Sequence, residues 1–223
     1  MRFFLLRHGQ TLFNLQEKVQ GHNDSPLTKL GQYQAKCAGY GARNISFDFA
    51  YSGDTKRQLD TARIFLSENK HPIEVISDPH FREMGYGKYE GGSYYDMLNP
   101  LYEALHEDYG AYAGLYRHYD DMTIASLLEK NDETGRFEGS ERSYRRFKEG
   151  LDRLADQYKK GDLLISTSSF VICSVLAHLF PELKQKSLVD NASLTILGYQ
   201  EGKYELLSYN DISYRLQGEA HYR

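Results

Sequence analysis

Short apolar runs alternate with longer amphipathic segments along this chain, and that alternation limits the folds open to it. The strand-like runs lie at residues 2–6, 47–52, 73–77 and 162–167. The helix-like segments lie at residues 25–41, 54–68, 141–161 and 170–180, and the third is expected to close at Gly161. Residues 192–210 predict a β-hairpin that turns near Gly202. Strands that alternate with helices favour an α/β fold in which helices cover a mostly parallel sheet.

Polar side chains follow the predicted strands at the points where those strands end. They are Arg7 and His8 after the first strand, Arg57 in the helix after the second, Glu83 in the loop after the third, and Ser168 and Ser169 after the fourth. Ligands of such sheets bind outside the carboxyl ends of the strands. We therefore expect these side chains to meet on one rim of the sheet.

The residue types on this rim suit an anionic ligand. Guanidinium groups match phosphate oxygens, and a histidine can act as acid, base or nucleophile near neutral pH. A carboxyl group in an apolar loop can acquire a raised pKa and donate a proton. Each residue also has an ordinary explanation: Arg7 and His8 as a surface pair, Arg57 as a solvated helix residue, Glu83 as a loop ion pair, and the serines as helix caps. The joint pattern is what predicts a site.

The composition is that of an ordinary globular protein, with 40% hydrophobic and 26% charged residues among 223. The net charge of −4 gives no sign of nucleic-acid binding. No apolar run approaches the ~20 residues of a membrane span, and the opening run stops at Leu6, too early for a signal peptide. Cys37 and Cys173 lie in separate helix-like segments, so we expect buried free thiols and a cytoplasmic protein. Neither a nucleic-acid nor a membrane partner is expected, and the oligomeric state is left open.

Residues 93–139 interrupt the alternation and are rich in tyrosine. A structureless loop of that length is improbable in a compact domain, so we expect a helical insertion packed over one edge of the sheet. Its tyrosines are Tyr94, Tyr95, Tyr102, Tyr109, Tyr112, Tyr116 and Tyr119.

Four stretches, "RHGQTLFN", "QGHNDSPLTKLGQYQA", "SGDTKRQLDTA" and "FREMGYGKYEG", resemble successive motifs of the histidine phosphatase superfamily, the phosphoglycerate mutase-like group. The resemblance runs over nearly the whole chain. It implies a three-layer α/β/α sandwich with a six-stranded, mostly parallel sheet, in a single domain over residues 1–223. The family places a variable insertion over its active site. The tyrosines of residues 93–139 would then form a pocket wall, or would simply pack the insertion.

The resemblance also implies roles for individual residues. His8 matches the nucleophile that forms a phosphohistidine, and Arg7 and Arg57 match the arginines that clamp the phosphoryl group. Glu83 matches the proton donor to the leaving group, which later acts as base for the attacking water. Three further positions match phosphate-contacting ones: Asn14, Gln20 and Gly21. No metal and no other cofactor is implied.

The chain departs from the family pattern after the fourth predicted strand. Relatives carry a second histidine there, in a Ser-His-Gly motif, whereas this chain has Thr167, Ser168 and Ser169. Ser168 and Ser169 would still contact phosphate, but without positive charge. His178 lies in helix-like sequence ten residues on and is a poor substitute. Losing one preorganised donor at a transition state typically costs about 10²–10³ in turnover.

Three functional hypotheses follow. The leading one is a phosphatase that hydrolyses a small phosphorylated metabolite through His8, slowly because the second histidine is missing. The alternative is a degenerate family member that binds a phosphorylated ligand with little turnover. A phosphoglycerate mutase ranks lower, because the mutase pattern contains tryptophans and this chain has none. The stretch "QGHNDSPLTKLG" is closer to the broad-specificity phosphatase branch.

Overall fold

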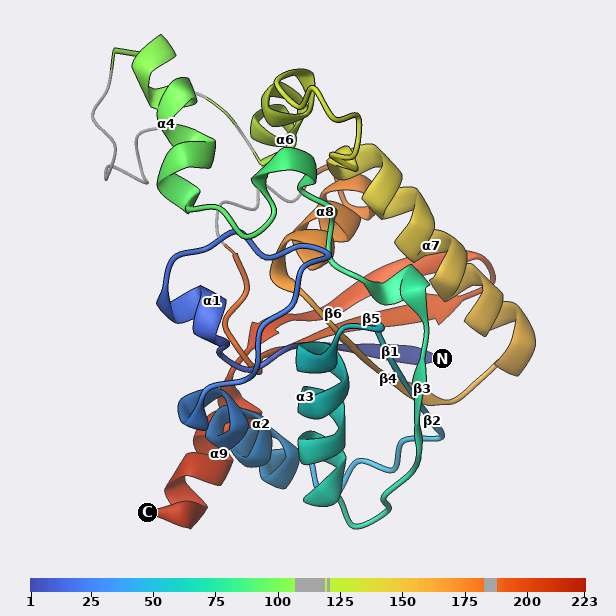
Figure 1. Cartoon of the computed structure of the whole chain (residues 1–223). Coiled ribbons are helices and arrows are strands. Elements are labelled where there is room, and N and C mark those ends of the chain that lie inside the picture. The colour runs from blue at the N-terminus through green and yellow to red at the C-terminus, as the bar shows by residue number, and fades with distance from the viewer. Residues whose placement is uncertain (107–118, 120, 183–187) are drawn as a thin grey trace.

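The computed structural model describes residues 1–106, 119, 121–182 and 188–223 (Figure 1). Three of the tyrosines predicted to belong to the insertion, Tyr109, Tyr112 and Tyr116, lie outside these ranges.

The described strands form one six-stranded sheet with the order β3-β2-β4-β1-β5-β6. Their bounds are β1 Arg2–Arg7, β2 Phe49–Ser52, β3 Val75–Ser77, β4 Asp162–Thr167, β5 Leu194–Gln200 and β6 Lys203–Asp211. The β1–β4, β2–β4 and β2–β3 pairs are parallel, whereas β5 is antiparallel to both β1 and β6. Only β5 therefore runs against the other described strands, which confirms the mostly parallel sheet.

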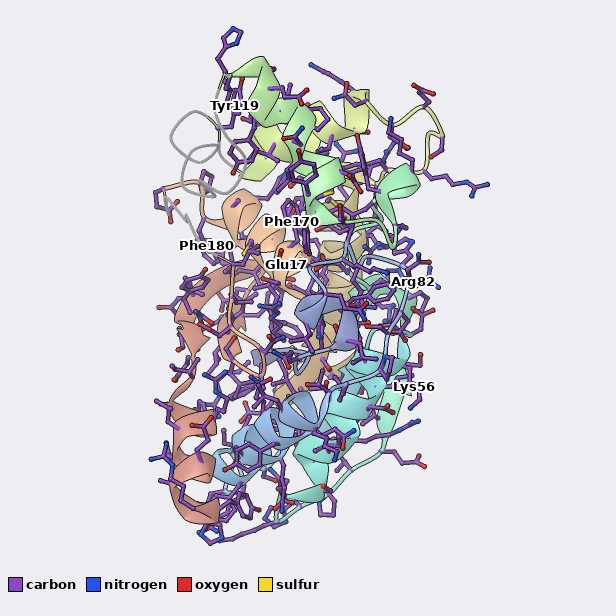
Figure 2. All side chains as sticks on the ribbon, turned by 60° about the vertical axis from the view of Figure 1, so that its left-hand side comes forward. Glu17, Lys56, Arg82, Tyr119, Phe170 and Phe180 are labelled. Carbon is purple, nitrogen blue, oxygen red and sulfur yellow. The ribbon has the colours of Figure 1, made fainter. Side chains whose placement is uncertain are left out.

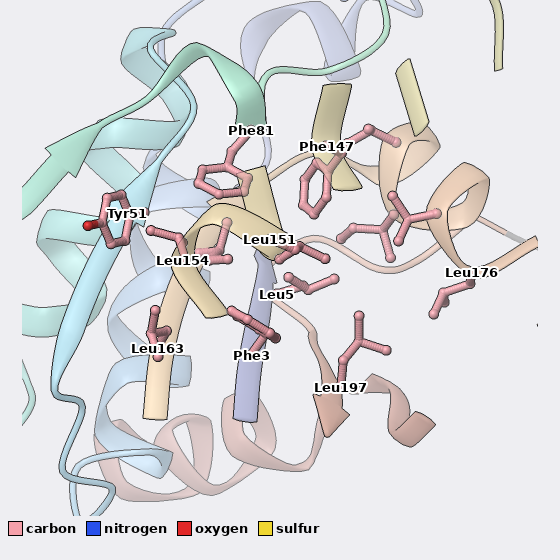
Figure 3. Packing of buried hydrophobic residues seen from close by; sticks show 14 of the residues in the cluster. Phe3, Leu5, Tyr51, Phe81, Phe147, Leu151, Leu154, Leu163, Leu176 and Leu197 are labelled. Atoms are coloured by element: carbon pink, nitrogen blue, oxygen red, sulfur yellow. The ribbon is translucent and has the colours of Figure 1, made fainter. Parts of the chain in front are cut away.

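Helices cover both faces of this sheet, as the sequence predicted (Figure 1). The described helices are α1 Leu12–Leu15, α2 Lys29–Gly41, α3 Lys56–Ser67, α4 Tyr94–Ala104, α6 Asp121–Lys130, α7 Gly139–Tyr158, α8 Ser169–Leu179 and α9 Ser213–Tyr222. Successive residues of β1 point to opposite faces because the side chains of a strand alternate. Phe3 and Leu5 join the core under α7 and α8 (Figure 3), and Phe4 and Leu6 join the core under α2 and α3. The three-layer sandwich is therefore confirmed.

The range predicted as an insertion contains α4 and α6, which pack on a third apolar cluster above the rim of the sheet (Figure 1). Tyr102, only 1% exposed, belongs to this cluster. Asp132 joins this part to the preceding loop, since its carboxylate accepts from the backbone N–H groups of Lys88 and Phe137. Hydrogen bonds of this kind hold the pKa of Asp132 down at about 2 against the opposing effect of burial.

Some ends and elements differ from the sequence prediction. Helix α7 ends at Tyr158 rather than at Gly161, because Lys159 takes the left-handed conformation at φ 60° and its N–H bonds to the carbonyl of Ala155. The hairpin turn near Gly202 is confirmed, with positive φ at Glu201 and Gly202. Helices α1 and α9 were not predicted. None of the described helices has the length and apolar character needed to cross a bilayer.

Candidate active site

A pocket opens where β1 ends and α8 begins, at the rim predicted from the sequence. It encloses about 720 Å³, counting the part open to solvent. Six of the predicted site residues line it: Arg7, His8, Asn14, Gln20, Glu83 and Ser169. The other three, Arg57, Gly21 and Ser168, are buried and lie outside the lining.

His8 is fixed by the strand pairing that precedes it. β1 lies between β4 and β5, and the backbone N–H of His8 continues the ladder by donating to the carbonyl of Thr167 at 3.0 Å. The imidazole is 4% exposed, and its Nδ1 lies 2.8 Å from the carbonyl oxygen of Gly9. A carbonyl can only accept, so Nδ1 carries the hydrogen and Nε2 keeps its lone pair.

The protonation state of His8 follows from its surroundings. Burial lowers the pKa of His8 well below its usual 6.5, and the positive charges of Arg57 and Arg7 lower it further. The imidazole is therefore neutral at neutral pH, as a nucleophile must be. Of the two arginines, Arg7 lines the pocket together with His8, and Arg57 does not.

Gly9 has a packing reason to be glycine. A Cβ there would lie 2.2 Å from the carbonyl oxygen of Gly31, so the turn after β1 needs a bare backbone to pass the first turn of α2.

The two arginines are held differently. Arg7 donates from Nη1 to the carbonyl of Val189, and its buried Nε finds no acceptor among the described residues. An N–H in that condition is available to an anion. Arg57 is fully buried and donates from Nη2 to the carbonyl of Gly21 at 2.7 Å and from Nη1 to that of Asn23 at 2.8 Å. Burial lowers the pKa of Arg7, while Glu83 is among the groups that oppose this effect.

Glu83 lines the pocket and caps α8. Its Oε1 accepts from the N–H groups of Met84 and Val171, both at 2.8 Å, and its Oε2 accepts from that of Phe170 at 3.0 Å. Burial raises the pKa of Glu83 above its usual 4.5, although these N–H groups and Arg57 favour the charged form. A carboxyl group with a raised pKa beside a nucleophile suits a proton donor.

The two serines after β4 differ in their surroundings. Ser168 occupies the N-cap position of α8, but its side chain makes no capping bond. Its Oγ accepts instead from Gln58 Nε2 at 2.9 Å, which leaves the hydroxyl hydrogen for another acceptor. Ser169 lines the pocket, and its Oγ accepts from the N–H of Val189 at 3.1 Å. His178 faces the carbonyl of Ser174 and the carboxylate of Glu141, and it does not line the pocket.

The loop that follows β1 supplies the remaining predicted residues. Asn14 lies in α1, where its side chain accepts from the N–H of Thr11 at 3.1 Å. Gln20 lies 2.7 Å from the hydroxyl of that same threonine. A Cβ on Gly21 would lie 2.3 Å from the carbonyl oxygen of Met84, so the loop can pass the Glu83 segment only with glycine here. The carbonyl of Gly21 therefore accepts a hydrogen bond from Arg57, and Gly21 does not line the pocket.

One acidic residue that was not predicted organises this loop. The carboxylate of Glu90 accepts from four backbone N–H groups, at 2.8–3.2 Å, those of Gly21, His22, Asn23 and Tyr86. The carbonyls of Gly21 and Asn23 are the ones that hold Arg57. Glu90 thus fixes the cradle of Arg57 without lining the pocket. Its only sequence signal is an acid beside two glycines in "KYEGG", which many surface loops share.

The chemistry available here is transfer of a phosphoryl group to nitrogen. A neutral imidazole faces the pocket, two guanidinium groups place positive charge beside it, and a carboxyl group can supply a proton. Among the described side chains, no three of the types His, Cys, Asp and Glu gather as they would around a metal ion.

Comparison with known proteins agrees with this chemistry. The family model of the histidine phosphatase superfamily (branch 1) matches residues 3–212. The uncharacterized phosphatase PhoE of Bacillus subtilis strain 168 is 29% identical over 209 residues, which cover 92% of each chain. The adenosylcobalamin/alpha-ribazole phosphatase of Escherichia coli K12 is 31% identical over 118 residues, which cover 53% of this chain and 55% of that protein. A crystal structure of phosphoglycerate mutase from Bacillus anthracis strain Sterne has a TM-score of 0.90 and 27% identity, and the match covers 98% of this chain and 96% of that one.

Proposed function

Because this chain belongs to branch 1 of the histidine phosphatase superfamily, we propose that it hydrolyses a small phosphate monoester through a phosphohistidine at His8. The observation that carries the proposal is the state of His8: a neutral imidazole whose Nδ1 is hydrogen-bonded to the carbonyl of Gly9, so that Nε2 keeps its lone pair, under the influence of the charges of Arg57 and Arg7. We further propose one domain over residues 1–223, with residues 93–139 inserted over the site. The free, buried Cys37 and Cys173 favour a cytoplasmic setting.

The proposed reaction has two steps. His8 Nε2 attacks phosphorus, the bond from phosphorus to the ester oxygen breaks, and Glu83 gives its proton to that oxygen. Water then attacks the phosphohistidine, Glu83 takes the proton from the water, and phosphate leaves with His8 restored. Arg7 and Arg57 stabilise the charge that spreads over the transferring oxygens in both steps.

Ser168 supports a second candidate, a protein that binds a phosphorylated ligand with little turnover. It stands where we expect the family's second histidine, and its hydroxyl offers a hydrogen bond but no positive charge. The retained His8 and Glu83 favour turnover, so we rank the enzyme first and expect it to be slow.

Trapping the intermediate separates these two candidates. The protein is exposed briefly to a labelled aryl phosphate and quenched without acid, because phosphohistidine is acid-labile. Mass mapping should place the label on His8, and His8→Ala should show neither label nor product. Label on another residue, with His8 clean, contradicts the mechanism. Vanadate binding without label or product identifies a binding protein.

A further inference from the structure

The pocket has one charged end and one apolar wall. Arg7, His8 and Glu83 lie at the charged end. The wall comes from α4, α6, the start of α8 and the segment before β5, and its main members are Met97, Leu98, Ile124, Leu128, Phe170 and Leu188. Figure 2 labels Phe170 at the start of α8, just below the helices of the insertion. The ester group and the rest of a substrate would therefore meet very different surroundings.

Among the described lining residues, the cationic side chain lies at the end of the pocket that holds His8. Arg7 is the only arginine or lysine among the described residues that line the pocket. The nearby Arg57 already donates to the carbonyls of Gly21 and Asn23 and to the Asp24 carboxylate. Glu83 adds negative charge once it has given up its proton. A second anionic group on a substrate would thus find no cation along the described wall.

The wall is built into the fold rather than assembled from exposed side chains. Met97, Leu98 and Leu128 are at most 7% exposed and belong to the same buried cluster as Tyr102 and Phe137. Met97 and Leu98 come from α4 and Leu128 from α6, so the two helices fix the wall together. The group that carries the phosphate would lie between this wall and the charged end, in a space of about 720 Å³ that includes the part open to solvent.

We infer that the preferred substrate is a monophosphate ester whose leaving group is apolar and carries no second anionic group, an aryl phosphate being the simplest case. The inference rests on the proposed function for its ester chemistry and on the pocket wall for its selectivity. A carboxylate pressed against Met97, Leu98 and Leu128 would lose its water without meeting a cation among the described lining residues, whereas an apolar ring would gain contact area.

A matched pair of substrates tests the selectivity. 4-Isopropylphenyl phosphate and 4-carboxyphenyl phosphate have similar shapes and differ in one charge. The carboxylate also makes its phenol the better leaving group, so chemistry alone favours the charged ester. We expect kcat/KM to be at least tenfold higher for the isopropyl ester. Equal values, or a preference for the carboxylate, would overturn the inference and leave the phosphatase function intact.

Leu188 allows the selectivity to be shifted by design. It lines the pocket and is 38% exposed, so the fold should tolerate a long polar side chain there. Leu188→Arg should move the ratio of the two kcat/KM values several-fold toward the carboxylate ester. Leu188→Gln, which is polar but uncharged, should move it much less. If both variants shift the ratio equally, the selectivity does not come from the missing cation and the inference fails.

Binding measurements separate the two proposals if neither ester is turned over. The corresponding arylphosphonates cannot be hydrolysed, and calorimetry gives their affinities directly. Tighter binding of the isopropyl compound by tenfold or more upholds the pocket inference, while the absence of turnover defeats the phosphatase proposal. Equal binding defeats the inference as well.

Discussion

His8 and Glu83 lie on one pocket with pKa values displaced in opposite directions, and this sets the pH dependence of the reaction. The pKa of His8 lies well below 6.5, so the nucleophile stays unprotonated into mildly acidic solution. The pKa of Glu83 lies above 4.5, and the first step needs its protonated form. We expect kcat/KM to peak on the acidic side of neutrality and to fall as pH rises through the pKa of Glu83. A profile measured with an unactivated alkyl phosphate checks this.

The substrate's own ionisation must be separated from that of Glu83, because a phosphate monoester also titrates near pH 6. Glu83→Gln removes the carboxyl group, so the pH dependence that remains in this variant comes from ionisation of the substrate. We expect the turnover of this variant to fall by a factor of about 10²–10⁴. We also expect its pH profile of kcat/KM to lose the alkaline limb, which is the fall that deprotonation of Glu83 causes in the wild type. An unchanged limb in this variant would show that Glu83 does not set it.

Ser168 is the position where a single substitution should raise activity. Ser168→His should increase kcat more than it changes KM, because the imidazole would act mainly on charge that develops in the transition state. Gln58 Nε2, which now donates to Ser168 Oγ, could donate to one ring nitrogen and leave the other N–H for the phosphoryl group. We expect kcat to rise by about tenfold to a hundredfold. This is less than a preorganised donor typically contributes, because the residues around position 168 are not arranged to hold an imidazole.

The same substitution should also be made together with Ser169→Gly, since the family motif has glycine there. Steady-state kinetics of both variants provide the measurement, and vanadate binding shows that they remain folded. If both bind vanadate and neither gains activity, the missing histidine is not what limits turnover.

Among single residues, the ends of the predicted strands pointed to Arg7 and His8, whereas Asn14 and Gln20 followed only from the family resemblance. Arg7 and His8 could be predicted because β1 is a continuous apolar run whose end is unambiguous. The capping of α8 by Glu83 could not, because its bonds to Phe170 and Val171 join positions 87 and 88 residues apart. The serines looked like the natural caps, and only the folded chain shows a distant carboxylate in that role.

At the scale of elements, the loop after α1 depends on Glu90. Glu90→Ala would leave the N–H groups of Gly21, His22 and Asn23 without their acceptor and would loosen the carbonyls that hold Arg57. We expect the free energy of unfolding to fall by about 1–3 kcal/mol. Vanadate affinity should fall about tenfold, the equivalent of roughly 1.4 kcal/mol. Glu133→Ala removes an exposed carboxylate and should change neither quantity. Loss of stability with unchanged vanadate affinity would show that Glu90 supports the fold but not the site.

Elements with a strong apolar pattern were predicted, and those held by close backbone approach were not. β4 has three consecutive aliphatic residues and α8 is mostly apolar, and both were predicted at or within one residue of their observed bounds. Helix α9 has few apolar residues, yet it packs tightly on α2, and a Cβ on its Gly218 would lie 2.1 Å from the carbonyl oxygen of Cys37. A glycine that permits two helices to touch looks, in sequence, like any glycine in a polar segment.

At the scale of the whole molecule, binding of an anion at the site should increase the stability of the folded protein. An anion that binds only the folded state raises the free energy of unfolding, by about 2.7 kcal/mol at a hundred times its dissociation constant. We expect vanadate at millimolar levels to raise the melting temperature of the wild type, and Arg7→Ala to lose most of that response. Arg145→Ala removes an exposed arginine from α7, where it pairs with Glu141, and should respond like the wild type. A wild type that does not respond would contradict the anion site.

The place of β1 in the sheet has a consequence for how the chain is made. β1 leaves the ribosome before the other described strands, yet its neighbours in the sheet are β4 and β5, and β4 begins 155 residues after β1 ends. At typical synthesis rates of ~5–20 residues per second, β1 waits for roughly 8–31 s before β4 exists. During that time the apolar segment that delivers His8 has neither of its edges paired. The nascent chain, rather than the finished protein, is therefore the form in which we expect this molecule to aggregate most readily.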